Sequence, residues 1–147
     1  SGVVDLTLSD FSGCARLGSG EVWCWGRNER GQLGGGIGSN HGEPVRVDGV
    51  TEVEAMRAGH HFFLARTSAS TLIGWGGNGD AQLGIGTETE GELPVEILDG
   101  VQGMEGGQKH ACAVMEDQAI LCWGDNTFGQ LGDGSTTPRS EPVAVPL

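Results

Sequence analysis

A ten-residue motif, W-G-x-N-x-x-[GA]-Q-L-G, occurs three times along the chain and restricts its fold more than any other feature. The copies begin at Trp25, Trp75 and Trp123, so successive copies are 50 and 48 residues apart. A proline stands ten residues after the last glycine of each copy and begins a β-rich run, PVRV, PVEI or PVAV. A period of about 50 residues indicates an array of structural repeats. We expect three complete repeats, at residues 1–47, 48–98 and 99–147.

Each repeat carries short β-strand patterns. In the first repeat, two such segments flank Gly18-Ser19-Gly20, which predicts a hairpin because glycine tolerates the positive φ of a tight turn. The proline-led run supplies another strand, since proline is tolerated where a strand begins. The segment before Ser9, Gly59 or Gly107 supplies the fourth. Four short antiparallel strands per repeat predict an all-β protein built from β-propeller blades.

Glycine accounts for 28 of the 147 residues, which excludes a helix-rich bundle. Each glycine inside a helix costs about 1 kcal/mol relative to alanine. Propellers normally have about 4–8 blades. Three blades are therefore expected to form part of a larger or composite propeller.

The motif, the Pro-Val pair after it and the G-x-x-H-x-C pattern at residues 107–112 resemble the repeat of the regulator of chromosome condensation family. The resemblance covers the whole chain and implies a β-propeller of four-stranded blades. Ala81 departs from the motif glycine, and Ser12 and Phe62 replace the motif histidine. In character the chain is closer to secreted bacterial members of the family.

The residues that recur at matching positions are expected to be structural. The tryptophans suit packing between blades, the glutamines suit hydrogen bonds to loop backbone, and the leucines suit the core. The motif asparagines are expected to close Asx-turns. The nine structural repeat residues are Trp25, Gln32, Leu33, Trp75, Gln82, Leu83, Trp123, Gln130 and Leu131.

The four cysteines fall in two hairpins. If the three central residues of each hairpin form its turn, Cys14 faces Cys24 and Cys112 faces Cys122. Directly opposed residues lie about 4.5–5.5 Å apart at Cα, within the range for a disulfide. We expect two disulfides and an extracellular or periplasmic location. Two pairs of buried, reduced thiols are the alternative.

No pattern of catalytic residues is present, so we expect a protein that is not an enzyme and has no cofactor. The four histidines differ in their positions within the repeats, which disfavours a metal site. Acidic residues outnumber basic ones by 20 to 8, which disfavours nucleic acid as a partner. The chain has no apolar run long enough for a membrane span and no signal-peptide pattern. The acidic residues 88–92 are expected to be solvated, with cation binding as the alternative.

Function is expected where the repeats differ from one another. Exposed aromatic and arginine side chains are enriched among the residues that dominate protein interfaces. Phe128 occupies a loop position that is arginine and aspartate in the other repeats, and its alternative is to pack under its own loop. The candidate partner-binding residues are Arg27, Arg30, His60, His61 and Phe128.

We therefore expect a non-catalytic, secreted protein-interaction module with an unidentified protein partner. A self-assembling unit is the first alternative, a homo-oligomer in which two or more chains complete the propeller. Three blades would leave strand edges and apolar faces open to water, which favours such assembly. The family resemblance implies two further alternatives, a guanine-nucleotide exchange factor and an inhibitor of β-lactamase.

Overall fold

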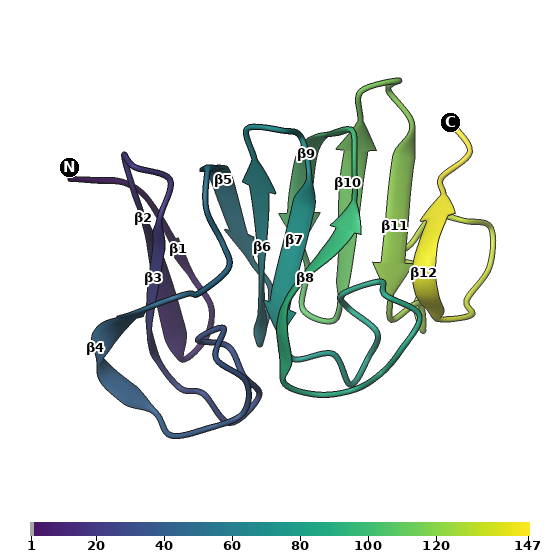
Figure 1. Ribbon diagram of the computed structural model, residues 1–147. Helices are drawn as coiled ribbons and strands as arrows, with labels where there is room; N and C mark the ends of the chain where they lie inside the picture. Colours follow the sequence, from purple (N-terminus) through teal and green to yellow (C-terminus); the bar gives the residue numbers. More distant parts are fainter. Residues whose placement is uncertain (1) are drawn as a thin grey trace.

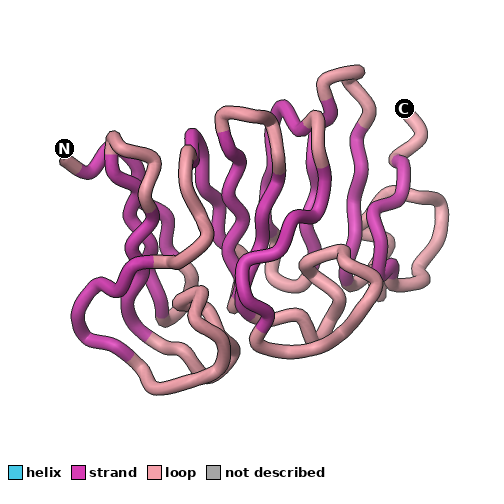
Figure 2. The backbone as a smooth tube through the Cα atoms, in the orientation of Figure 1, coloured by secondary structure: helices cyan, strands magenta, loops and turns pink. Residues whose placement is uncertain are grey.

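The computed structural model describes residues 2–147 as twelve β-strands and, within that range, no helix (Figure 1, Figure 2). The strands form three four-stranded antiparallel sheets, each built from strands consecutive in the chain. This confirms the predicted all-β class with four strands per repeat. The sheets are called blades 1, 2 and 3 below.

The strands of each blade follow sequence order from one edge of the sheet to the other. Blade 1 contains β1 (Val3–Leu8), β2 (Ser12–Leu17), β3 (Val22–Gly26) and β4 (His41–Arg46). Blade 2 contains β5 (Val53–Ala58), β6 (Phe62–Thr67), β7 (Leu72–Gly76) and β8 (Glu92–Leu98). Blade 3 contains β9 (Val101–Gly106), β10 (His110–Met115), β11 (Ile120–Gly124) and β12 (Arg139–Ala144).

The register of the central hairpins agrees with the turn positions predicted from the sequence. Cys14 pairs with Cys24 in blade 1, and Cys112 pairs with Cys122 in blade 3. In blade 2 the same position pairs Leu64 with Gly74. At the turn of blade 1, Gly20 has a φ of 83°, a value that glycine adopts without strain.

The three blades stand side by side in chain order, with the first strand of each blade on the same side of the row (Figure 1). β1 contacts β5, and β5 contacts β9, so these three strands form the inner edge. The last strands, β4, β8 and β12, form the outer edge. This is the arrangement of consecutive blades in a propeller.

Two apolar cores lie between the blades. In the first, Cys14, Val22 and Cys24 of blade 1 pack with a cluster that includes Phe63 and Trp75 of blade 2. The second core joins blade 2 to blade 3 and is built from equivalent positions, with Trp123 of blade 3 fully buried. Apolar surface removed from water is the main force that holds neighbouring blades together.

A tryptophan indole bonds each blade to the one before it. The Nε1 of Trp75 donates to the backbone oxygen of Gln32 at 3.0 Å, and the Nε1 of Trp123 donates to that of Gln82 at 2.9 Å. Gly84 permits the close approach of Trp123, because a Cβ at Gly84 would lie 2.6 Å from the Cδ1 of that ring. Trp25, in the first blade that the structure describes, is only half-buried.

The motif asparagines do not close the Asx-turns expected from the sequence. Their side-chain oxygens instead accept a hydrogen bond from the motif leucine five residues later, at 3.0 Å in all three repeats. Each side-chain nitrogen donates to a later backbone oxygen, as Asn78 does to Thr87 at 2.9 Å. The asparagine therefore organises a long loop, because one buried amide can bond backbone groups from several parts of it.

Replacing Asn78 by Ala should lower the free energy of unfolding by about 1–3 kcal/mol, because the buried N–H of Leu83 would lose its acceptor. Equilibrium denaturation in urea measures the change. Glu88→Ala in the same loop is the control, since Glu88 is exposed and should change stability very little. Equal stabilities for the two variants would contradict a structural role for the asparagine.

Candidate protein-binding site

The turn between the first two strands of each blade and the motif loop after the third strand lie at the same end of the molecule, called the loop end (Figure 1). Backbone hydrogen bonds hold each loop to its turn. Arg27 donates to Phe11, Gly77 to His61, and Asp125 to Lys109, at 2.8–2.9 Å. The variable residues of the three repeats are thereby collected on one surface.

The motif glutamines hold the tip of each loop. The Oε1 of Gln32 accepts from the backbone N–H of Arg30, and Gln82 and Gln130 make the same bond to Asp80 and Phe128, at 2.8–2.9 Å. The motif leucines anchor the loops from below, with exposed fractions of 2 % or less. The tip side chains are therefore presented from backbone that is fixed in place.

The loop tips of blades 1 and 2 face the following blade. Arg30 forms an ion pair with Glu90, which itself accepts backbone hydrogen bonds from Asn78 and Gly79. Asp80 lies 3.2 Å from the Nζ of Lys109 in blade 3. Within the acidic run, the expectation of simple solvation is therefore wrong for Glu90, which links two blades.

The third loop tip is different. Phe128 is 89 % exposed, so it does not pack under its own loop. Phe11, in the first turn, is 59 % exposed and lies beneath the guanidinium of Arg27 at 5.4 Å from its ring centroid. Arg27 also pairs with Glu29. The loop end thus carries an exposed phenylalanine near each end of the row of blades.

His60 and His61 stack at the turn of blade 2, with ring centroids 3.8 Å apart. The Nε2 of His60 lies 2.9 Å from the Oδ2 of Asp10 in blade 1. The pKa of His61 is held below its ordinary value of 6.5, chiefly by burial and then by the positive charges of His60 and the nearby arginines. Its Nδ1 is buried without a hydrogen-bond partner among residues 2–147.

A small polar pocket of about 100 Å³ lies between the blades at the loop end. Arg30, His60 and His61 line it together with Lys109, whereas Phe128 is not among its lining residues. The structure therefore brings three of the five candidate partner-binding residues into one pocket, with Arg27 in the adjoining loop. Phe128 stands separately on blade 3.

The other two histidines lie away from this pocket. His41 begins β4 on the outer edge and His110 begins β10. Within residues 2–147, no three His, Cys, Asp or Glu side chains are grouped closely enough to hold a metal ion. The described part of the chain also contains no helix long and apolar enough to cross a membrane.

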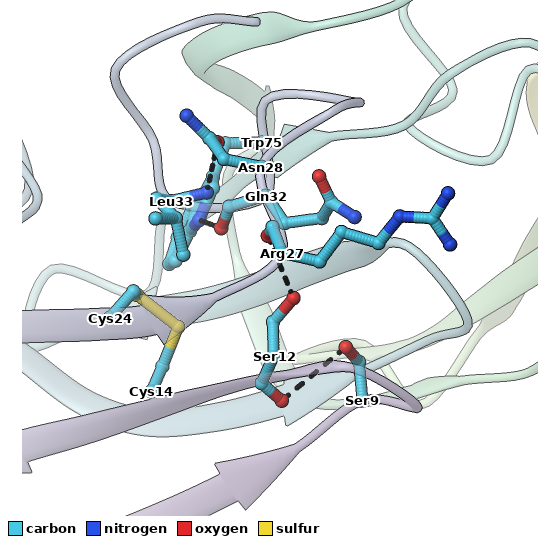
Figure 3. Close-up of a disulfide and its surroundings, with 9 residues drawn as sticks. All are labelled: Ser9, Ser12, Cys14, Cys24, Arg27, Asn28, Gln32, Leu33 and Trp75. Carbon is cyan, nitrogen blue, oxygen red and sulfur yellow. Dashed lines mark hydrogen bonds between the residues drawn. A yellow bond between two sulfur atoms is a disulfide. The ribbon is translucent and has the colours of Figure 1, made fainter. Parts of the chain in front are cut away.

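All four cysteines lie at bonding distance in the predicted pairs, with S–S separations of 2.08 Å for Cys14–Cys24 and 2.09 Å for Cys112–Cys122. The first pair is fully buried between blades 1 and 2, below the loop held by Asn28 and Gln32 (Figure 3). The second pair occupies the same position in blade 3, where Cys122 is buried and Cys112 is half-buried.

Three residues of the loop end were not among the sequence candidates. Asp10 and Phe11 occupy the turn positions of His60 and His61, so aligning the repeats could have found them. Glu90 could not be found in this way, because its role depends on how one blade stacks on the next.

The arrangement of the strands and the contacts between sheets define a β-propeller repeat protein. A family model described as "Regulator of chromosome condensation (RCC1) repeat" matches residues 19–66 and 117–147. A second model with the same description matches residues 3–32 and 103–130. The chain belongs to the regulator of chromosome condensation repeat family, which confirms the resemblance inferred from the sequence.

Among curated relatives, Protein RCC2 of Mus musculus is 35% identical over 79 residues, which cover 48% of this chain and 14% of that protein. The mitochondrial RCC1 domain-containing protein RUG3 of Arabidopsis thaliana is 31% identical over 98 residues, covering 65% of this chain and 22% of that protein. This chain thus spans less than a quarter of each relative.

Solved structures agree with the fold. Human WBSCR16 superposes with a TM-score of 0.84 at 22% identity, covering 98% of this chain and 38% of that one. Prp20p of Saccharomyces cerevisiae gives 0.82 at 18% identity, covering 97% and 38%. The ectodomain of the receptor kinase CR4 of Physcomitrella patens gives 0.55 at 22% identity, covering 90% and 32%. At these identities the likeness concerns the fold alone.

The denatured, unreduced protein should release no thiol to an alkylating reagent, and four after reduction, as counted by mass spectrometry. Replacing both Cys14 and Cys24 by Ser should lower the free energy of unfolding by about 3 kcal/mol, because the closed loop no longer restricts the unfolded chain. Four reactive thiols before reduction would overturn the disulfide assignment.

Lowering the pH should reduce the stability of the folded protein through the protonation of His61. Because its pKa is lower in the folded protein than when unfolded, its contribution to stability is complete above pH 6.5 and is lost as the pH falls through the folded value. His61→Gln should therefore lose less thermal stability than the wild type between about pH 7.5 and about pH 5. His41→Gln, on the exposed start of β4, is the control and should follow the wild type.

Proposed function

We propose that this chain is a non-catalytic protein-interaction module that binds a protein partner through its loop end, outside the cytosol. The observation that carries the proposal is the 89 % exposure of Phe128 at the tip of a loop whose backbone is held by Gln130 and Asn126. An exposed aromatic side chain on ordered backbone loses little conformational freedom on binding. Such residues often dominate the energy of an interface.

The surroundings of Phe128 and Phe11 favour a protein partner over a small molecule. The two phenylalanines line neither the polar pocket of about 100 Å³ nor the hollow of about 380 Å³ at the turns of the three blades, whereas small molecules usually bind in concave sites. Arg27 and Phe11 add a cation and a second aromatic ring to the same end. Arginine and aromatic residues are the types enriched in protein interfaces.

Proteins of the same fold supply precedents for this class of partner. Prp20p has binding properties toward Gsp1p and histones, and yeast RCC1 (Prp20) has been crystallised bound to Kap60. We extend to this chain only the use of the propeller as a protein-binding scaffold. Its own partner has to fit the exposed phenylalanines and the net charge of −12.

An extracellular or periplasmic location forms part of the proposal. Its support is the placement of all four cysteines in two bonded pairs, since disulfides persist in oxidising compartments. A fold-level precedent is the CR4 ectodomain, which belongs to a receptor kinase.

The test is capture of a partner from the extracellular fraction of the source cells by the oxidised, immobilised protein. Phe128→Ala should reduce the captured amount at least about tenfold, the effect of losing about 1.4 kcal/mol of binding free energy. Its melting temperature should stay at the wild-type value, because Phe128 is exposed. Leu93→Ala, which truncates a 58 %-exposed side chain on the outer strand of blade 2, is the matched control.

Two results would contradict the proposal. If the wild type and Phe128→Ala capture equal amounts of the partner, the loop end is not the binding surface. A lower melting temperature for Phe128→Ala would show that Phe128 stabilises the fold and is not a dedicated binding residue.

A further inference from the structure

The polar pocket at the loop end carries positive charge, although the chain as a whole has a net charge of −12. Its lining includes the cations Arg30 and Lys109 and one carboxylate, that of Asp80. His60 and His61 also line it and add positive charge when they are protonated. Because blades 1, 2 and 3 each contribute residues, the pocket belongs to the interfaces inside the described part of the chain.

Both cations have hydrogen-bond donors that their ion pairs do not use. Among residues 2–147, the guanidinium of Arg30 bonds through Nη1 to Glu90 and through no other nitrogen. The Nζ of Lys109 donates to the Oδ1 of Asp80 at 3.2 Å, and an ammonium group carries three protons. The two side chains are 45 % and 47 % exposed. A ligand in the pocket therefore meets charged donors without breaking either ion pair.

Two buried polar atoms near this pocket have no hydrogen-bond partner within residues 2–147. One is the Nδ1 of His61, which lines the pocket, and the other is the Nε2 of Gln32, which is fully buried. The Oε1 of Gln32 accepts from the backbone N–H of Arg30, so this amide lies next to the loop tip. A Cβ at Gly76 would lie 2.6 Å from the backbone oxygen of His61 and 3.3 Å from the Cα of Gln32. Both unpaired atoms thus belong to one junction of blades 1 and 2, where leaving them unbonded costs free energy.

Blade 3 shows which acceptor the motif glutamine takes. There the Nε2 of Gln130 donates to the Oδ2 of Asp125 at 3.0 Å. Arg27 occupies the position of Asp125 in blade 1, and its side chain extends from the loop in the same direction as that of Gln32 (Figure 3). Blade 1 therefore has a cation where blade 3 has a carboxylate, and its loop lacks the acceptor that blade 3 supplies from its own sequence.

His61 responds to this excess of positive charge. The charged and titratable groups around it are Asp10, Arg27, Arg30 and His60, together with Asp80 and Lys109, which line the same pocket. Burial lowers the pKa of His61 most, the nearby cations lower it further, and Asp10 acts in the opposite direction. An anion in the pocket would favour the protonated imidazole and so raise this pKa.

We propose that the pocket binds a carboxylate side chain, aspartate or glutamate, of the protein partner, held by Arg30 and Lys109, and that His61 takes up a proton from solvent on binding. The inference rests on the proposed function, because it names a chemical group of that partner. A guanidinium presents paired N–H donors that match the geometry of a carboxylate. A volume of about 100 Å³ suits one small polar group inserted from a protein surface. Phe11 and Phe128 lie outside the lining of the pocket, where they can contact apolar surface around that group.

Acetate is the probe, because it is a carboxylate small enough for the pocket. Proton–nitrogen correlation spectra of the isotope-labelled, oxidised protein follow the side chains of the four histidines. Sodium acetate should shift the signals of His61 saturably and raise its pKa, whereas acetamide and sodium chloride at equal concentration should do neither. His41, at the start of β4, is the internal control and should stay unchanged. An unchanged His61, or an equal response to chloride, overturns the inference.

Replacing the cations tests which residues hold the carboxylate. Arg30→Gln should weaken acetate binding at least about tenfold, because a hydrogen bond between two charged groups is lost, and Lys109→Gln should act in the same direction. Arg46→Gln is the matched control, since Arg46 is also ion-paired and 47 % exposed but lies on β4 at the outer edge. Circular dichroism shows whether each variant is folded. Wild-type affinity in folded Arg30→Gln and Lys109→Gln overturns the site.

The affinity for acetate should rise several-fold as the pH falls from about 7.5 to about 5.5, because acetate stays ionised and the complex binds one more proton. His61→Gln should bind acetate like the wild type at the higher pH and should lose most of this rise. A rise of the same size in both proteins overturns the proton uptake at His61.

Capture of the partner separates this inference from the proposed function. Sodium acetate should release the captured protein at concentrations at which sodium chloride does not, and Arg30→Gln should capture at least about tenfold less than Arg46→Gln. A partner that depends on Phe128 but is captured equally by these two variants overturns the inference and leaves the proposed function in place. A chain that binds acetate yet captures no protein overturns the proposed function and, with it, the assignment of the carboxylate to a protein.

Discussion

The packing of a buried tryptophan against the preceding blade, where its indole N–H donates to the backbone oxygen of a glutamine, is the contact on which the rest of the structure depends. The donor in the bond between Trp75 and Gln32 comes from a strand end, and the acceptor comes from a loop of the neighbouring blade. Because both groups are buried, leaving either unbonded would cost about 1–3 kcal/mol. The bond therefore fixes the tryptophan ring against the motif loop of the preceding blade, which carries the variable residues.

The motif separates the residues that hold each loop in place from the residues that vary between repeats. The asparagine and glutamine side chains form hydrogen bonds with the backbone of each loop. The side chains of the residues between them are not needed to hold the loop, so these residues can vary. The tip residue is the clearest case: Arg30 and Asp80 make ion pairs between blades, whereas Phe128 at the same position faces solvent. The same loop scaffold therefore holds a tip residue that either joins two blades or faces solvent.

The strand patterns within each repeat were enough to predict the all-β fold, and the turn centres were enough to predict the register, because both are set within one repeat. Contacts between repeats were harder to predict from the sequence. The ion pair of Arg30 with Glu90 crosses from one blade to the next, and the role of Asn78 depends on a loop that folds back over several residues. The repeat boundaries, at residues 1–47, 48–98 and 99–147, stay a prediction, as do the partner-binding roles.

One cross-strand pair in the central hairpin of each blade affects how the protein unfolds. In an array of repeats, each unit is stabilised mainly by its own packing and by its contacts with its neighbours. The covalent links Cys14–Cys24 and Cys112–Cys122 lie in blades 1 and 3, and blade 2 has Leu64 beside Gly74 at the same position. A reducing environment would therefore remove a restraint from the central hairpins of blades 1 and 3 and leave that of blade 2 unchanged.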